Sequence, residues 1–172
     1  MEEIFHRVSI RKYEDRPVEA EKIEAILKAA MAAPSAANQQ PWEFFVVTDR
    51  QKLAQLSGVS PYAGCTAGAP AAIVSVYRKE CLLPDYAQID LSIAMENLWL
   101  ATDAEGLGGV WLGIAPIMER MDQVEKILDM PDNLSAFAIF PLGYPAETRK
   151  QQDRFDRSRI HFAVGTVPGS SN

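Results

Sequence analysis

Apolar and polar residues alternate with two different periods along this chain, and these periods predict where helices and strands lie. Residues 19–32 and 118–128 carry apolar side chains every three to four positions, which is the pattern of an amphipathic helix. Asp49 is expected to cap a short helix through Leu53 and Leu56. Runs rich in β-branched, aromatic and other apolar residues predict strands at residues 43–48, 71–77, 106–114 and 136–142.

Residues 85–105 form the longest helical pattern, and its apolar side chains do not keep to one face. A helix of this kind is buried either in a core or against a partner subunit. Asp90 and Asn97 share a face with small residues, and we interpret them as a satisfied polar pair in the core, because buried polar groups need hydrogen-bond partners. The apolar residues of the segment are Ile89, Ile93, Met95, Leu98, Trp99 and Leu100.

Composition narrows the class of protein. The 172 residues, 48% of them hydrophobic, suffice for one globular domain, and the net charge of −6 is spread along the chain, which argues against a nucleic-acid surface. A cytoplasmic protein is predicted, because there is neither a basic-then-apolar leader nor an apolar run of about 20 residues that could span a membrane. Cys65 and Cys81 fit a reducing compartment and are interpreted as small buried hydrophobes.

A polar loop at residues 33–42 separates a predicted helix from a predicted strand and reads Ala-Pro-Ser-Ala-Ala-Asn-Gln-Gln-Pro-Trp. Pro34 ends the helical pattern, and Pro41 favours an extended backbone at the residue before it. The hydroxyl and amide groups between the two prolines offer donors and acceptors that suit a planar heterocycle with imide edges. The alternative is an ordinary polar connection.

A cluster of basic residues stands out near the N-terminus of this acidic chain. Arg7, Ser9 and Arg11 are two residues apart, so in an extended backbone they project to one side while Val8 and Ile10 face the other. Two guanidinium groups and a hydroxyl could then converge on one anion, such as a phosphate. The alternative is a solvated basic surface paired with nearby acidic residues.

Several catalytic patterns are absent from the sequence. There is no Gly-x-Ser-x-Gly motif, no cysteine with a matched histidine, no metal-ligand spacing and no phosphate-binding Gly-x-x-x-x-Gly-Lys run. The glycines of residues 106–114 do not form a dinucleotide fingerprint, although Gly113 within an apolar strand marks either a bulge or a close approach of a ligand. If the chain is an enzyme, a bound cofactor is expected to supply its chemistry.

The C-terminal part changes character after Pro145. Its residues are strongly polar and basic, so this segment cannot build a core of its own and is expected to lie across another surface, such as a partner subunit. Residues 165–172 are expected to be disordered.

Four motifs in order make the chain resemble the nitroreductase family of flavin enzymes. They are Arg7-Val8-Ser9-Ile10-Arg11, the loop at residues 33–42, the glycine-rich stretch at residues 106–113 and the terminal Gly143-Tyr144-Pro145. Each motif is weak alone, but four in sequence over nearly the whole chain are specific.

The resemblance implies an α+β fold with a mostly antiparallel sheet flanked by helices, in a single FMN-binding domain at residues 1–164. It further implies an intertwined homodimer in which residues 85–105 form the dimer helix and the loop at residues 33–42 reaches the flavin held by the other subunit. Leu112, Gly113 and Ile114 match the stretch whose backbone lies near flavin N5. The other cofactor-binding residues implied are Arg7, Val8, Ser9, Arg11, Pro34, Ser35, Ala36, Asn38, Gln40 and Arg154.

Two departures from the family pattern affect the expected site. Val8 stands where many relatives carry a basic or polar residue, so one contact on the phosphate side is expected to be missing. The chain also lacks most of an insertion after Tyr77, so the substrate side of the flavin is either open or covered by residues such as Tyr62 or Tyr86. Arg149 is a rival to Arg154 for the phosphate contact.

The function implied is that of an FMN-dependent oxidoreductase, which passes a hydride from NADH or NADPH to a nitroaromatic, a quinone or a similar acceptor. Donors from Asn38, Gln40 and the Gly113 region are expected to stabilise the anionic reduced flavin, and no residue is assigned as a general acid or base. The alternatives are an FMN carrier or redox sensor without NAD(P)H turnover, a flavin dehalogenase or flavin-breakdown enzyme, and a structural dimer without a cofactor. No nucleic-acid or membrane partner is expected.

Overall fold

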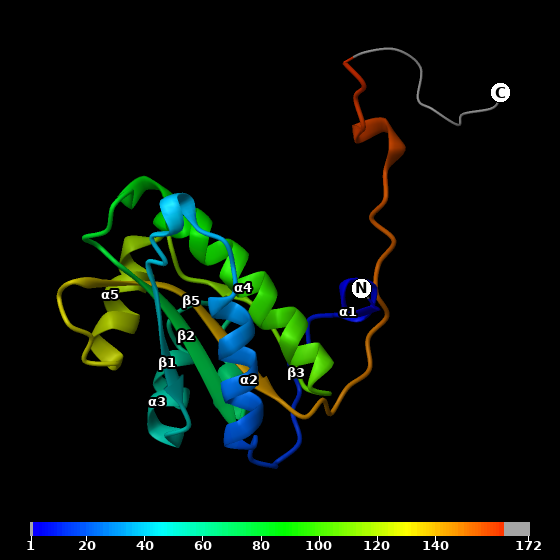
Figure 1. Cartoon of the computed structure of the whole chain (residues 1–172). Helices are drawn as coiled ribbons and strands as arrows, with labels where there is room; N and C mark the ends of the chain where they lie inside the picture. Colours follow the sequence, from blue (N-terminus) through cyan, green and yellow to red (C-terminus); the bar gives the residue numbers. More distant parts are fainter. Residues whose placement is uncertain (1, 164–172) are drawn as a thin grey trace.

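The computed structural model describes residues 2–163 and has an antiparallel sheet at its centre (Figure 1). The three long strands are β1 (Trp42–Val47), β2 (Ala71–Arg78) and β5 (Leu134–Gly143). The strand order is β1-β2-β5-β3, and β4 also pairs with β5. The predicted antiparallel sheet is thereby confirmed.

The prediction of one continuous strand at residues 106–114 is wrong. The segment forms two short strands, β3 (Gly108–Gly109) and β4 (Leu112–Gly113), which pair with different parts of β5. The gap between them lies beside Pro141 of β5, whose carbonyl accepts a hydrogen bond from Val110 N at 3.3 Å. Pro141 has no N–H to donate in return, so a regular ladder is not continued at this point.

Helices cover both faces of the sheet. On one face lie α2 (Ala20–Met31) and α4 (Ala87–Ala104), and on the other α3 (Arg50–Leu56) and α5 (Met118–Ile127), each with its own buried cluster (Figure 1). The short helix α1 (Glu2–His6) does not cover the sheet and packs against α4. Short 3-10 turns are η1 (Ala36–Asn38), η2 (Gly64–Gly68), η3 (Pro84–Tyr86) and η4 (Arg157–Arg159).

The strand β5 explains why the two cores form one body. All ten of its residues are buried, and its side chains enter both clusters: Ile139 packs with α3 and α5, whereas Phe140 packs with α2 and α4. Asp49 caps α3 as predicted, since its side chain accepts a hydrogen bond from Lys52 N at 2.8 Å.

The long helix α4 is apolar on more than one side, as predicted. Leu91 and Leu98 are fully buried against the sheet, while Ile89 is 55% exposed on another side of the helix. The interpretation of Asp90 and Asn97 as a pair is wrong. Asp90 binds the loop after α2, and Asn97 donates to the carbonyl of Ala29 at 3.1 Å, so each is satisfied by a separate partner that lies far away in the sequence.

The segment after β5 leaves the body of the protein and extends past α1 (Figure 1). Gln151 ties it to the N-terminal segment by donating from Nε2 to the carbonyl of Arg7 at 2.7 Å. The disorder expected for residues 165–172 concerns a part of the chain outside the described residues.

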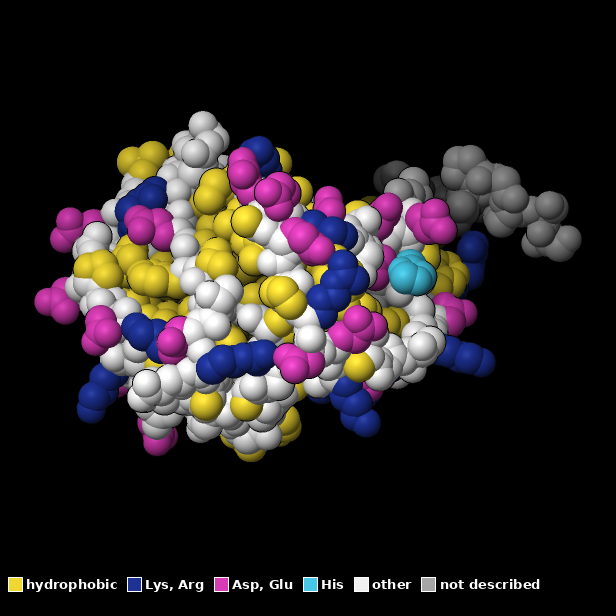
Figure 2. All heavy atoms as spheres, turned by 90° about the horizontal axis from the view of Figure 1, so that it is seen from below, with side chains coloured by type: hydrophobic (Ala, Val, Ile, Leu, Met, Phe, Trp, Pro, Cys, Tyr) yellow, Lys and Arg dark blue, Asp and Glu magenta, His cyan; other side chains and the backbone are white. Residues whose placement is uncertain are grey.

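The surface seen in Figure 2 mixes acidic and basic side chains with exposed apolar ones, and no large block of one charge sign covers that face. Within residues 2–163, no helix has both the length and the apolar character needed to cross a membrane.

Candidate functional site

The N-terminal segment that follows α1 is extended, as the spacing of its residues predicts. Ser9 forms a parallel bridge with Gly109 of β3, and Ile10 N donates to the carbonyl of Gly109 at 3.0 Å. Ile10 is buried, and the hydroxyl of Tyr13 closes the turn behind it through the carbonyls of Ile10 and Pro141, at 2.8 and 3.1 Å. The backbone that carries the basic residues is therefore fixed to the sheet.

A polar cavity of about 230 Å³ lies between this segment and the C-terminal arm. We call it the cradle, and it is lined by Arg7, Val8, Ser9, Arg11, Arg149, Lys150, Gln151, Gln152 and Arg154. Five of these side chains are cationic, so the cavity is suited to an anion with several charges. The structure thus brings together Arg7, Val8, Ser9, Arg11 and Arg154, which the resemblance assigned to the cofactor.

Arg149 and Arg154 both reach the cradle, but they differ in their partners. Arg149 makes two hydrogen bonds to Glu147, at 3.0 and 3.1 Å, whereas Arg154 donates to the amide oxygen of Gln151 at 3.3 Å. The backbone N–H of Arg11, 2.6 Å from Glu147 Oε1, holds the pKa of the Glu147 carboxyl below its ordinary value. Of the two arginines, Arg154 is therefore the one without a carboxylate partner among the described residues.

Arg7 has an unmet hydrogen-bonding capacity. Its guanidinium lies over the ring of Trp99, 3.9 Å from the centroid, and its side chain is 14% exposed. The Nε atom is 3.6 Å from Glu96 Oε1, which is too far for a hydrogen bond, and it has no other partner among the described residues. A buried donor left unpaired costs about 1–3 kcal/mol, so an anion in the cradle would remove this cost.

A second cavity, of about 440 Å³, adjoins the strand β4. It is lined by Arg11, Ser60, Tyr62, Trp111, Leu112 and Gly113. Arg11 lines both cavities, so the cradle and the β4 stretch are neighbours in the structure. Ile114 differs from its neighbours: its side chain is fully buried in the core, and its N–H donates to Phe137 O at 3.2 Å.

Two aromatic residues give the second cavity its apolar character. Tyr62, one of the residues named above as a possible cover for the substrate side, is 74% exposed and lines this cavity. Trp111 packs edge-on against Phe137 with ring centroids 5.7 Å apart. Sequence reasoning assigned no role to Trp111 or Ser60, because a tryptophan in an apolar run looks like a core residue and a serine in a turn looks like a connection.

The glycine at position 113 is not required by packing within this chain. A Cβ atom added to Gly113 would meet nothing within 4 Å, whereas one added to Gly109 would lie 2.4 Å from the Phe140 ring. Gly113 itself pairs regularly with Ala138. The open space beside Gly113 belongs to the second cavity.

The loop at residues 33–42 is compact and held by its own polar groups. Ser35 Oγ accepts from Gln40 N at 3.0 Å, and Gln40 Nε2 donates to Asn38 Oδ1 at 3.0 Å. Three of its residues have positive φ angles, namely Ala37 at 49°, Asn38 at 54° and Gln40 at 46°. Each such angle costs a non-glycine residue about 1 kcal/mol, so the rest of the structure must enforce this turn.

A single chain does not bring this loop to the cradle. The loop is bonded to Asp90, while Arg7 lies on Trp99 nine residues later, which is about two and a half turns of α4. The two regions therefore lie towards opposite ends of that helix, with η1 near its N-terminus and α1 near its C-terminus (Figure 1). Pro34, Ser35, Ala36, Asn38 and Gln40 do not line either cavity.

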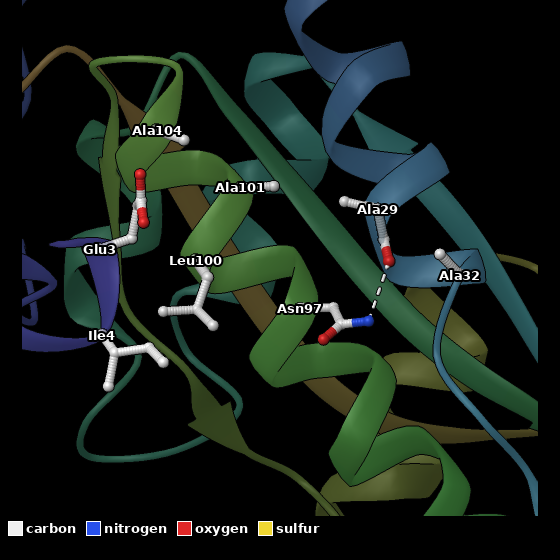
Figure 3. Close-up of a pocket in the computed structure, with 8 residues that line it drawn as sticks. All are labelled: Glu3, Ile4, Ala29, Ala32, Asn97, Leu100, Ala101 and Ala104. Carbon is white, nitrogen blue, oxygen red and sulfur yellow. Dashed lines mark hydrogen bonds between the residues drawn. The ribbon is translucent and has the colours of Figure 1, made fainter. Parts of the chain in front are cut away.

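An apolar groove of about 430 Å³ runs between α1, α2 and α4 (Figure 3). In Figure 3, Asn97 reaches from α4 to the carbonyl of Ala29 and closes one side of the groove. Exposed Ile89 and Ile93 also belong to α4. The residues that line the groove are Glu3, Ile4, Ala29, Ala32, Asn97, Leu100, Ala101 and Ala104.

Neither cysteine lines the cradle or the second cavity. Cys65 and Cys81 are free and half-buried, rather than fully buried as expected, and burial raises the pKa of the Cys65 thiol. No group of three or more histidine, cysteine, aspartate or glutamate side chains could hold a metal ion within residues 2–163.

Comparison with known proteins gives the site a family context. The sequence profile described as the Nitroreductase family matches residues 4–80 and 59–144. A protein of Methanothermobacter thermautotrophicus, named NADH dehydrogenase/NAD(P)H nitroreductase, is 41% identical over 163 residues, which are 94% of this chain and 85% of that protein.

Solved structures agree with the sequence match. A protein from Clostridium acetobutylicum, named as an NADH oxidase, superposes with a TM-score of 0.91 at 42% identity, over 95% of this chain and 99% of its own. An FMN-dependent nitroreductase from Clostridium difficile R20291 superposes with a TM-score of 0.86 at 34% identity, over 92% of this chain and 96% of its own.

Proposed function

Since this chain belongs to the nitroreductase family, we propose that it is an FMN-dependent oxidoreductase that uses NADH or NADPH to reduce a nitroaromatic, a quinone or a similar acceptor. Two similar proteins support the cofactor and the donor through their names, one as an FMN-dependent nitroreductase and one as an NAD(P)H nitroreductase. The single observation that carries the proposal is that Arg11 lines both the cationic cradle and the cavity beside β4.

The cradle fits the phosphate of FMN. The unpaired Nε of Arg7 points to a missing acceptor, and the guanidinium of Arg154 has no carboxylate to neutralise it among the described residues. We assign Arg7, Ser9, Arg11 and Arg154 to the phosphate and ribityl part of the cofactor. Arg149 is not assigned, because its guanidinium is already bonded to the Glu147 carboxylate. Val8 lines the same cavity but offers only apolar contact.

The second cavity fits the flat ring of the cofactor. Because a Cβ atom at position 113 would meet no other atom within 4 Å, a planar group has room against the backbone of Leu112 and Gly113. FMN, when bound, would supply the hydride chemistry that no side chain of this protein can supply. Arg11, which lines both cavities, would orient the cofactor along their length and add positive charge near the ring.

The proposed site is completed by a second copy of this chain. A homodimer would cover the apolar groove and the exposed isoleucines of α4, and would allow the loop of one subunit to reach the cradle of the other. Asn38 and Gln40 would then offer amide donors to the cofactor, together with the backbone of Pro34, Ser35 and Ala36. The exposed Phe155 of the C-terminal arm, 74% accessible in the single chain, supports packing of that arm on a partner.

These assignments make residues 1–164 one FMN-binding domain, as the sequence predicts. Acceptors would enter beside Tyr62 and Trp111, whose aromatic rings favour a flat aromatic substrate. No side chain is assigned as a general acid or base, so the protein acts by binding and orienting its two substrates in turn at one place.

The proposal is tested by the visible absorption spectrum of the purified protein with FMN, before and after anaerobic addition of NADH or NADPH. Bound flavin should bleach with the donor and recover its colour with a nitroaromatic or a quinone. Binding without bleaching by either donor would instead support a flavin carrier or redox sensor. A protein that takes up no FMN would contradict the proposal altogether.

A further inference from the structure

A buried carboxylate of α4 binds the loop at residues 36–40 through hydrogen bonds. Asp90, in the first turn of α4, is 2% exposed. Its Oδ1 atom accepts from the backbone N–H of Ala36 at 2.9 Å, and its Oδ2 atom accepts from Gln39 Nε2 at 2.7 Å. Each carboxylate oxygen of Asp90 therefore faces a donor that belongs to the loop.

The amide of Gln39 cannot turn around to accept instead of donating. Leu83 fixes its orientation, because Leu83 N donates to Gln39 Oε1 at 2.7 Å while Gln39 Nε2 donates to Leu83 O at 3.0 Å. A flipped amide would lose both bonds to Leu83. Position 90 must consequently present acceptors on both sides, which a carboxylate does and a carboxamide does not.

Arg78 holds the other end of the same turn. Its Nη2 atom donates to the carbonyl of Gln40 at 2.6 Å and to that of Gln39 at 3.3 Å, and Glu43 lies 3.6 Å from its Nη1 atom. The carbonyls of Gln39 and Gln40 are thereby fixed to β2. The residues with unfavourable φ angles, Ala37, Asn38 and Gln40, are thus held by hydrogen bonds from two elements: Asp90 of α4 on one side and Arg78 of β2 on the other.

We propose that Asp90, Gln39 and Arg78 are positioning residues of the flavin site, which hold residues 36–40 in their left-handed turn before the cofactor arrives. This inference rests on the proposed function. The three residues contact the loop and not the cofactor, and they set the direction in which Asn38 and Gln40 present their amides to the partner subunit. A loop ordered in advance loses less entropy when it binds, and donors fixed in advance stabilise developing negative charge better.

The direct test is Asp90→Asn, which keeps the size of the side chain but places an N–H₂ group against a donor. FMN binding should weaken by about 10-fold, the equivalent of one buried polar mismatch. The reduction potential of the bound flavin should move to more negative values, and its visible circular dichroism should change. Removing the opposing donor in Asp90→Asn/Gln39→Ala should add little further loss, because the two residues act as one unit.

A control separates positioning from general stability. Val124→Ala removes buried volume from α5 in the core on the far side of the sheet, so it should lower the melting temperature and leave FMN affinity and potential unchanged. Should Asp90→Asn fail to fold, Arg78→Gln offers a second test from the surface side of the loop. It should weaken FMN binding several-fold and shift the potential in the same direction.

Two results would overturn the inference, and they are distinguishable. Wild-type protein that binds FMN, together with Asp90→Asn and Arg78→Gln dimers that bind it with unchanged affinity and potential, would contradict the positioning role alone. Wild-type protein that takes up no FMN would contradict the proposed function and, with it, this inference.

Discussion

The cradle and the loop at residues 33–42 serve the same proposed site but are stabilised in opposite ways. The cradle is rich in charge and only partly paired: five cationic side chains line it, Arg149 is bonded to Glu147, and Arg7 Nε is buried without a hydrogen-bond acceptor among the described residues. The loop carries no charged side chain, and its Ser35, Asn38 and Gln40 groups are bonded to one another. The cradle keeps a buried donor without a hydrogen-bond partner among the described residues, whereas the loop satisfies these groups within itself.

This difference shows how affinity and geometry can be divided between two parts of a site. In the proposed site, charge in the cradle would supply most of the attraction for an anionic cofactor, and the ordered loop would supply direction. The two regions lie towards opposite ends of α4, so one chain contains both halves but does not join them. Substitutions in the cradle should therefore act mainly on affinity, and those in the loop should act less on affinity and more on the behaviour of the bound flavin.

The largest effect is expected for Arg7→Ala. The change removes charge-assisted hydrogen bonds to the phosphate, each of which contributes about 1.5–3 kcal/mol, so FMN binding should weaken by about 100-fold. Titration with FMN, followed by flavin fluorescence, measures the loss. Arg7→Lys serves as the control, because it keeps the charge without the planar fork and should recover only part of the affinity. Equal affinity of wild type and Arg7→Ala would mean that the cradle is merely a basic surface.

A smaller effect is expected for Gly113→Ala, where nothing in this chain opposes the added methyl group. The folded protein should keep its melting temperature, while FMN binding should weaken by about 10-fold because the methyl enters the space proposed for the ring. The matched change Gly109→Ala should do the reverse and lower stability, because its Cβ would clash with Phe140. Unchanged FMN affinity in Gly113→Ala would rule out close contact of the flavin with β4.

Asn38→Ala should have a milder effect on binding. It removes one neutral donor and frees Gln40 Nε2, so affinity should fall by a few-fold only, about 1 kcal/mol, while the reduction potential becomes more negative. Potentiometric titration of the bound flavin measures this shift. A loss as large as that of Arg7→Ala would contradict the division between the two regions.

The smallest expected effect is a pH dependence confined to the cradle side. His6 Nδ1 lies 2.8 Å from Asp103 Oδ2, and this hydrogen bond, followed by the charge of Asp103, raises the pKa of His6 above its ordinary value of about 6.5. The protonated pair therefore stabilises the contact of α1 with α4 fully below about pH 6.5, and this contribution is lost as the pH rises through the raised pKa.

Because His6 is well exposed, its effect on FMN affinity should be small. The dissociation constants of wild type and His6→Gln for FMN are compared at each pH, and their ratio should change about two-fold between pH 6 and pH 9. A ratio that does not vary with pH would show that α1 does not support the cradle through this ion pair.

Much of the fold could be predicted because the decisive information is local. The period of α2 and α5, the cap at Asp49 and the apolar run of β5 are each contained in a short stretch of sequence. The break between β3 and β4 could not be foreseen in the same way, since it depends on Pro141 in a strand about 30 residues later.

The candidate site shows the same difference between local and long-range information. The extended spacing of Arg7, Ser9 and Arg11 was readable from neighbouring residues, and the structure brings them together with Arg154. The partners of Asp90 lie about 50 residues earlier in the chain, so their role required the tertiary structure. Trp111 was missed for a related reason, because only the fold turns one side of an apolar segment towards a cavity.

The central claim is that cradle and loop meet across two subunits, and mixed dimers test it most directly. Arg7→Ala and Asn38→Ala/Gln40→Ala chains, carrying different affinity tags, would be co-expressed and the mixed dimer isolated. Both parent dimers should bind FMN more weakly than wild type, the Arg7→Ala dimer by the larger factor, whereas the mixed dimer should regain one site of wild-type affinity, built from the intact cradle of one chain and the intact loop of the other. A mixed dimer that binds FMN no better than its parents would contradict the shared site.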